Sequence, residues 1–318
     1  MLEQLPKVLF SVLGSSALLG RLATRYGLRD EQSFARRFIA GETMADAIRA
    51  AHILETSGLN VTFDLLGEQV TSTAEATAAT RAYLSIVDEL QRADTGRQLS
   101  VKLSQLGIDV DRATAIDNLR RVLDGAGRAG FFVRVDMERS TYTAHTFDAF
   151  ETVWNIGYRN GGVAIQAYLR RSAADVARMN ALGASVRLVK GAYYEPRDVA
   201  FQHKAEVDAS FVQLTHVLLE HGTAPAIATH DPDMIAETVR FAESRNIAKD
   251  RYEFEMLYGV RRDLQASLAA QGHRVRIYIP FGTQWFPYFM RRLGERPANV
   301  GFVLKSLFRE RDQKSSTA

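Results

Sequence analysis

From residue 58 onward the chain alternates two patterns. Short runs rich in β-branched and aromatic residues predict buried strands, and the longer stretches between them, with apolar residues every three or four positions, predict amphipathic helices. The eight runs are Val61–Leu66, Leu99–Leu103, Phe131–Met137, Val163–Leu169, Ser185–Val189, Ala226–Thr229, Tyr252–Leu257 and Arg274–Ile279. Strands that alternate with helices form right-handed parallel units, and eight units close naturally into a (β/α)8 barrel of the TIM type.

A doubly wound open sheet is the competing fold. It would carry a phosphate-binding loop after the first strand, but the residues there are Leu66-Gly-Glu-Gln69. A literal G-x-G-x-x-G motif does occur at 125–130. A dinucleotide site needs a strand before this motif and a helix after it, whereas here the predicted helix comes first. We therefore interpret the motif as the end of a helix.

The predicted elements divide the 318 residues into three parts. Residues 1–57 have helical periodicity and are expected to form a helical segment packed on the barrel. Residues 58–309 would form the barrel as a single catalytic domain, since such barrels routinely exceed about 250 residues. The polar tail 310–318 is expected to be disordered.

Composition excludes several classes of function. The chain has no cysteine, which rules out disulfides, thiolate metal sites and cysteine nucleophiles, and a reducing cytosol suits it best. The net charge is only +3 and no basic cluster is present, so we expect no nucleic-acid binding. No run reaches the 18 or so apolar residues of a membrane span. No two histidines have the spacing of a metal-ligand pair, and those in the second half of the chain are scattered, for example His203, His216, His221 and His230. We therefore expect no metal site.

Polar residues lie at the ends of seven consecutive predicted strands. In a β/α barrel these ends form the mouth, where active sites occur. Charges on inward faces need partners, so Lys102 and Asp136 could pair, as could Arg187 and Glu255. A purely structural charge network is one explanation. Three enzyme classes also fit: a Schiff-base lyase with Lys102 or Lys190 as nucleophile, a phosphate-binding isomerase, and a redox enzyme with an organic cofactor.

The segment after the last strand separates these alternatives. Residues 291–299 resemble the R-R-L-x-E-R-x-x-N signature of the proline dehydrogenase family, and the strand ends resemble that family in the same order. The similar segments are Val101–Ser104, Arg134–Glu138, Gln166–Leu169, Arg187–Tyr193, Ala228–His230 and Glu253–Gly259. The resemblance extends from about residue 35 to about residue 305, and the compact length resembles the monofunctional bacterial enzymes.

This resemblance implies an activity and a distorted barrel. Members oxidise L-proline to Δ1-pyrroline-5-carboxylate, the first step of proline catabolism to glutamate, by hydride transfer from C5 of proline to N5 of FAD. A quinone takes the electrons, which implies peripheral membrane contact, here through the apolar run Leu9–Leu19. A pyrroline-5-carboxylate dehydrogenase would act downstream. The last helix lies over the barrel mouth, which leaves Val300–Arg309 to fill the outer position.

The resemblance also assigns individual residues. Arg291, Arg292 and Lys102 would bind the substrate carboxylate, and Glu295 would hold the two arginines. Asp136 would pair with Lys102 and organise the pocket, and Arg187 would lie near flavin N5. The residues that would pack on the proline ring are Tyr278, Tyr193 and Leu257. The further flavin contacts would be Gln166, Val189, Lys190, Gly191, Thr229 and His230.

Two other functions remain open. The main alternative is a Schiff-base aldolase or other lyase on the same barrel, which would use Lys102 or Lys190. The other is a barrel that serves as a binding or regulatory module without catalysis.

Overall fold

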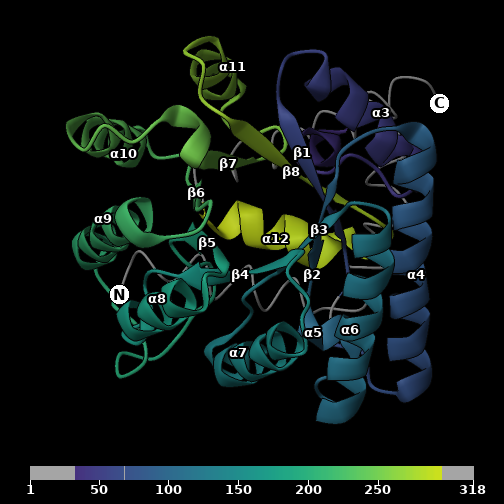
Figure 1. The fold of residues 1–318 in the computed structure, drawn as a ribbon. Helices are drawn as coiled ribbons and strands as arrows, with labels where there is room; N and C mark the ends of the chain where they lie inside the picture. The colour runs from purple at the N-terminus through teal and green to yellow at the C-terminus, as the bar shows by residue number, and fades with distance from the viewer. Residues whose placement is uncertain (1–32, 68, 296–318) are drawn as a thin grey trace, which may run out of the picture.

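A computed structural model of the chain describes residues 33–67 and 69–295, and the strands of this part form one closed barrel in chain order (Figure 1). All neighbouring strands are parallel, and β1 pairs with β8 to close the sheet. The strands are β1 Asn60–Leu65, β2 Gln98–Val101, β3 Phe132–Val135, β4 Gly161–Gln166, β5 Ser185–Val189, β6 Ala226–Ala228, β7 Glu253–Leu257 and β8 Val275–Phe281. The predicted (β/α)8 barrel is confirmed, and its closure excludes the open sheet.

Helices surround this barrel, as Figure 1 shows. Their buried faces are apolar, for example Tyr83 and Leu90 of α4 and Leu119 and Val122 of α6, and this burial against the strands is the main force that stabilises the fold. The outer helices are α4 Thr73–Ala93, α6 Arg112–Arg128, α7 Ser140–Asn155, α8 Ser172–Leu182, α9 Lys204–His221, α10 Pro232–Ser244 and α11 Arg262–Ala270. The short helices are η1 Phe34–Arg37, α5 Leu103–Leu106 and η2 Lys249–Arg251. Within the described residues, no helix has both the length and the apolar character of a membrane span.

The helix after β8 leaves this ring. Helix α12, Trp285–Glu295, crosses the centre of the barrel in Figure 1. Trp285 and Phe289 belong to a small apolar cluster with Phe38 and with Leu66, which directly follows β1. Leu66 marks the C-terminal end of the barrel, so the expected position of the last helix over the mouth is confirmed.

The outer position that α12 leaves empty is filled from the N-terminus. Helix α3, Met44–Glu55, contacts both β8 and β1, and its small residues Ala47 and Ala51 are fully buried. Alanines let the helix lie close to the strands. Helix α3 therefore holds the position that we expected for residues 300–309, which lie outside the described residues, as do residues 1–32.

Three predicted strands extended two or three residues past their observed C-terminal ends. Leu103, Met137 and Leu169 are apolar, but they lie buried in the segments that follow β2, β3 and β4. The apolar runs continue past the strands because Leu103 and Met137 still belong to the main core, and Leu169 packs in a small cluster with Tyr168 and Ala200. The boundaries at residues 57 and 309, and the disordered tail, stay predictions.

Candidate active site

The inside of the barrel opens to solvent at the C-terminal ends of the strands. Residues deep in the strands are buried, whereas Asp136, Val189, Leu257 and Tyr278 are partly accessible. Val189 and Leu257 are the last residues of their strands, Asp136 directly follows β3, and Tyr278 is the middle residue of β8. Because side chains alternate between the two faces of a strand, inward-facing residues of different strands can meet here.

Arg187 of β5 is the centre of the polar network at this mouth. Its Nη1 donates to Asp136 Oδ1 at 2.7 Å and to Ser100 Oγ at 3.0 Å, so the side chain reaches across the barrel to β2 and β3. Its Nε forms an ion pair with Glu255 Oε2 of β7 at 2.6 Å. Burial disfavours the guanidinium charge, but Glu255 and Asp136 outweigh burial and raise the pKa of Arg187 above its usual value. The predicted pairing of Arg187 with Glu255 is confirmed.

Tyr278 of β8 joins the same network. Its hydroxyl donates to Asp136 Oδ2 at 2.7 Å, and the guanidinium carbon of Arg187 lies 5.3 Å from the centre of its ring. Burial and the negative charge of Asp136 raise the pKa of Tyr278 well above 10.0. The hydroxyl therefore stays protonated and acts as a donor.

Lys102, directly after β2, has a closer partner than we predicted. Its Nζ lies 3.8 Å from Asp136 Oδ2 but only 2.5 Å from Asp64 Oδ1 on β1. Sequence reasoning missed Asp64, because β1 was the one strand without an assigned polar residue. A signal was available, since Asp64 follows Thr62 at the two-residue spacing of one strand face.

The carboxylates of this network differ in electrostatic surroundings. Burial is the largest effect on Asp64, and it raises the pKa of that carboxyl although Lys102 opposes the shift. Burial likewise raises the pKa of Glu255, although Arg187 opposes it. Asp136 is more accessible and shares its two oxygens between Arg187 and Tyr278. This network thus combines two cations, Lys102 and Arg187, with three acidic side chains, Asp64, Asp136 and Glu255.

Helix α12 brings further cations to the mouth. The guanidinium carbon of Arg291 lies 5.8 Å from the ring centre of Tyr193, in the loop after β5, so α12 reaches from the end of β8 to the segment that follows β5. Arg292 lies over the ring of Tyr288 at 5.3 Å. The helix is held by its apolar face and by a hydrogen bond from Trp285 Nε1 to Glu42 Oε1 at 3.0 Å. The side chain of Glu295 lies outside the described residues.

The residues predicted to bind a flavin lie around the ends of β4, β5 and β6. Gln166 is buried and donates to the carbonyl of Glu138 at 2.8 Å. His230 Nε2 accepts the backbone N–H of Leu257 at 2.7 Å, and Thr229 accepts that of Asp231 at 3.1 Å. The Gln166 and His230 contacts connect neighbouring mouth segments, and the Thr229 contact is local to the segment after β6.

The side chain of Lys190 is engaged outside the Arg187 network. Its Nζ donates to Asp208 of α9 at 2.5 Å and to Asp231, the N-cap of α10, at 2.8 Å. These ion pairs tie the end of β5 to the starts of two helices. The next residue, Gly191, has φ +114°, and a Cβ there would collide with the ring of Tyr168. This position therefore needs glycine for the packing of the mouth itself.

Two buried glutamates fix the mouth loops, and sequence reasoning assigned no role to either. The Glu138 carboxylate accepts the backbone N–H of Ser104 at 3.0 Å, and that of Glu195 accepts the N–H of Ser140 at 2.7 Å. Each carboxylate also accepts the serine hydroxyl. Charged acceptors of backbone N–H groups bind more strongly than neutral ones, so these contacts preorganise the mouth.

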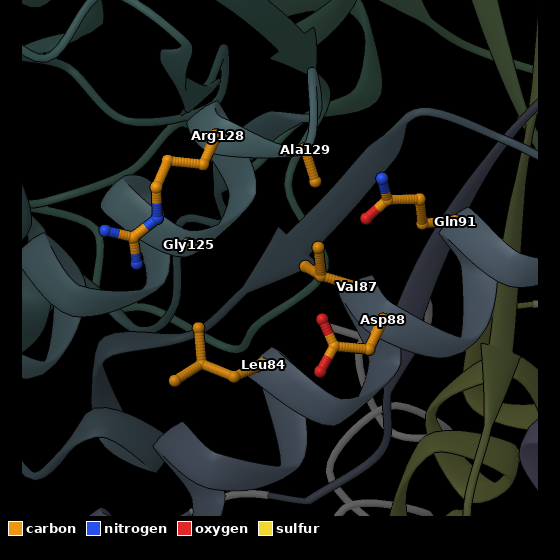
Figure 2. Close-up of a pocket in the computed structure, with 7 residues that line it drawn as sticks. All are labelled: Leu84, Val87, Asp88, Gln91, Gly125, Arg128 and Ala129. Atoms are coloured by element: carbon orange, nitrogen blue, oxygen red, sulfur yellow. The ribbon is translucent and has the colours of Figure 1, made fainter.

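A separate pocket of about 330 Å³ lies between α4 and α6 (Figure 2). Its lining includes Gly125 and Arg128 of the G-x-G-x-x-G motif, near the end of α6. The helix precedes β3, as predicted for a helix end. Helices of a β/α barrel run antiparallel to the strands, so this pocket lies away from the mouth. No group of His, Cys, Asp and Glu residues able to hold a metal ion occurs in the described part of the chain.

Comparisons with known proteins agree with this geometry. The family model for proline dehydrogenase matches residues 47–305. The chain is 38% identical to proline dehydrogenase 1 of Bacillus subtilis strain 168 over 301 residues, covering 95% of this chain and 98% of that protein. It is 39% identical to proline dehydrogenase of Deinococcus radiodurans over 281 residues, covering 87% and 91%.

A solved structure shares the fold. Proline utilization A from Bdellovibrio bacteriovorus, inactivated by N-propargylglycine, matches with a TM-score of 0.76 and 29% identity over 81% of this chain. The match spans 32% of that longer protein. Because the family model covers most of the chain and the curated relatives align over nearly their whole length, this chain belongs to the proline dehydrogenase family.

Proposed function

We propose that this chain oxidises L-proline to Δ1-pyrroline-5-carboxylate at the barrel mouth, with FAD as cofactor and a quinone as electron acceptor. The observation that carries the proposal is the network of Arg187, Asp136, Tyr278 and Lys102, covered by a helix that bears Arg291 and Arg292. These residues lie in a chain whose relatives are named proline dehydrogenases.

Substrate binding follows from the charges. Proline carries a carboxylate, and guanidinium groups bind carboxylates through two parallel hydrogen bonds. In the proposal Arg291 and Arg292 supply these bonds from α12 and Lys102 adds a third cation from β2. Leu257, Tyr193 and Tyr278 would form the walls around the ring. Tyr278 suits this role because its hydroxyl is held by Asp136, which orients the ring.

The residues at the mouth fit a flavin. Arg187 Nη2 is buried and has no hydrogen-bond partner among the described residues, so a donor is available for an acceptor atom of a ligand. FAD, when bound, would supply the hydride acceptor. Gln166, Val189, Lys190, Gly191, Thr229 and His230 would hold it around the ends of β4 to β6. Arg187 would favour negative charge on it, because its own charge is secured by Glu255 and Asp136.

The chemistry also requires a proton to leave. The lone pair of the ring nitrogen forms the C=N bond as hydride leaves C5, so the nitrogen must first be unprotonated. Asp136 is already committed to Arg187 and Tyr278, which suits it to positioning. A mouth covered by α12 would exclude water from the reacting atoms.

A Schiff-base lyase is disfavoured by the surroundings of both lysines. A Schiff-base lysine needs an uncharged amine, which proteins obtain by apolar burial or a neighbouring cation. Lys102 and Lys190 each form ion pairs with two carboxylates instead. Borohydride trapping with the substrate tests this alternative, because it would label one of these lysines.

The visible spectrum of the purified protein tests the main proposal. We expect the absorption bands of an oxidised flavin, and we expect L-proline to bleach them without air and a soluble quinone to restore them. Replacing Arg291 and Arg292 by methionine should leave the bound flavin but abolish saturation by proline. Arg120→Gln is a suitable control, because Arg120 is exposed on α6 and paired with Asp117.

Two results would contradict the proposal. One is a colourless protein that does not take up added FAD. The other is a double arginine variant with the same proline saturation curve as the wild-type protein. Membrane contact through Leu9–Leu19 stays a prediction, since that run lies outside the described residues.

A further inference from the structure

Asp64 is a fully buried carboxylate at the mouth to which the family resemblance assigned no role. It lies on β1, one residue before the strand ends, and its Oδ1 is 2.5 Å from Nζ of Lys102. The Lys102 side chain is itself only 8% exposed, so water contributes little to stabilising its charge. The protonation state of Lys102 therefore depends on the charged groups around it.

The groups that face Lys102 come from several elements. Asp64 lies on β1, Asp136 lies beyond β3, and the charge of Lys102 also acts on Tyr83 of α4. Burial raises the pKa of Tyr83 and of Tyr278, so both are neutral. Asp136 is 3.8 Å away and is shared with Arg187 at 2.7 Å. Among the described residues, Asp64 thus forms the shortest ion pair with Lys102, and the charge of Lys102 favours the ionised form of Asp64 against the effect of burial.

We propose that Asp64 is a positioning residue that aims Lys102 into the mouth and keeps its ammonium charged. The inference rests on the proposed function, because the charge of Lys102 matters to catalysis only if Lys102 binds the substrate carboxylate. Asp64 acts through Lys102 and needs no contact with the substrate. The same carboxylate also lies close enough to the Tyr278 hydroxyl to be affected by it, so one residue connects two walls of the site.

The variant Asp64→Asn tests this role with almost no change of shape. The amide oxygen can still accept from Lys102, but the negative charge that lies 2.5 Å from its Nζ is gone, so the ammonium form of Lys102 should be less favoured. Loss of a charge-assisted contact to the substrate should raise KM for proline on the order of 10- to 100-fold, with a smaller effect on kcat. Lowering the pH returns the proton to Lys102 and should bring KM back toward the wild-type value.

A double-mutant cycle shows whether Asp64 acts through Lys102. Lys102→Met should raise KM at every pH. Adding Asp64→Asn to Lys102→Met should raise it no further, because the residue that Asp64 serves is already absent. Asp117→Asn is the matched control, since Asp117 is exposed on α6 and pairs with Arg120 at 2.8 Å. Steady-state rates between about pH 6 and pH 9 supply both readouts.

The inference is overturned if Asp64→Asn leaves KM unchanged, or if the two substitutions multiply their effects on KM independently. A protein that does not oxidise proline refutes the proposed function instead. The same double-mutant cycle is then measured by urea unfolding. Lys102→Met should lower the urea midpoint, because it leaves the buried Asp64 carboxylate without its lysine partner. Addition of Asp64→Asn should recover that loss, and no recovery would refute the pairing itself.

Discussion

Replacement of Arg187 by methionine tests the buried network directly. The Arg187 side chain is 4% exposed, and it neutralises Glu255, which is 2% exposed, and Asp136, which is 14% exposed. Methionine fills similar space but leaves both carboxylates without their closest cation. Removal of one partner of a buried ion pair costs about 3–5 kcal/mol. Most of this cost should come from Glu255, because Asp136 keeps the Tyr278 hydroxyl and a distant Lys102.

The pH dependence of this loss has a definite sign. Burial raises the pKa of Glu255 even with Arg187 present, and removal of the cation raises it further. A carboxyl group with a raised folded-state pKa favours the folded state below its unfolded pKa, and this advantage disappears as pH rises through the folded pKa. The variant should therefore be closest to wild type near pH 5 and furthest from it near about pH 8.

Urea unfolding followed by circular dichroism at these pH values measures the effect. Arg178→Met is the matched control, because Arg178 also pairs with two carboxylates but is 41% exposed, and such exposed pairs contribute about 0–1 kcal/mol. A second substitution, Glu255→Gln, should recover part of the loss. If Arg187→Met cost no more than Arg178→Met, or if its deficit did not change with pH, the described network would be wrong.

Three further substitutions, one of them with a matched control, probe other parts of the site. Tyr278→Phe removes the donor to Asp136 and should lower kcat/KM by about tenfold or more in steady-state assays; unchanged kinetics would contradict a role for this contact. Gly191→Ala and Gly130→Ala both strain a left-handed backbone, but only the new Cβ at position 191 meets the Tyr168 ring. Calorimetry should therefore show the Gly191→Ala variant to be less stable than the Gly130→Ala variant by about 1–3 kcal/mol. Equal losses would mean that the ring contact contributes nothing. Phe289→Ala removes packing that holds α12, so it should raise KM for proline while the urea midpoint of the barrel moves little. A lower urea midpoint with an unchanged KM would show that α12 does not bind substrate.

The sequence was sufficient for the barrel and for most residues of its mouth. Strand and helix periodicities are local properties, and the order of eight alternating units leaves few topologies. The position of Gly125–Gly130 between a helix and a strand likewise excluded a nucleotide site. Polar residues on or directly after the strands identified Arg187, Asp136, Lys102 and Tyr278, since every strand of a parallel barrel ends at the same face.

Only the tertiary structure decided which of these groups meet. Arg187 contacts residues of β2 and β7 and the residue directly after β3. Such pairs across a barrel depend on closure, strand register and side-chain length together. Only the structure identifies Asp64 as the partner of Lys102. Closure of the barrel places β1 between β8 and β2, and this brings Asp64 of β1 next to Lys102 at the end of β2. The position of α12 over the mouth has the same origin: α3 already covers the outer face of β8 and β1, so the apolar face of α12 packs against Phe38 and Leu66 instead.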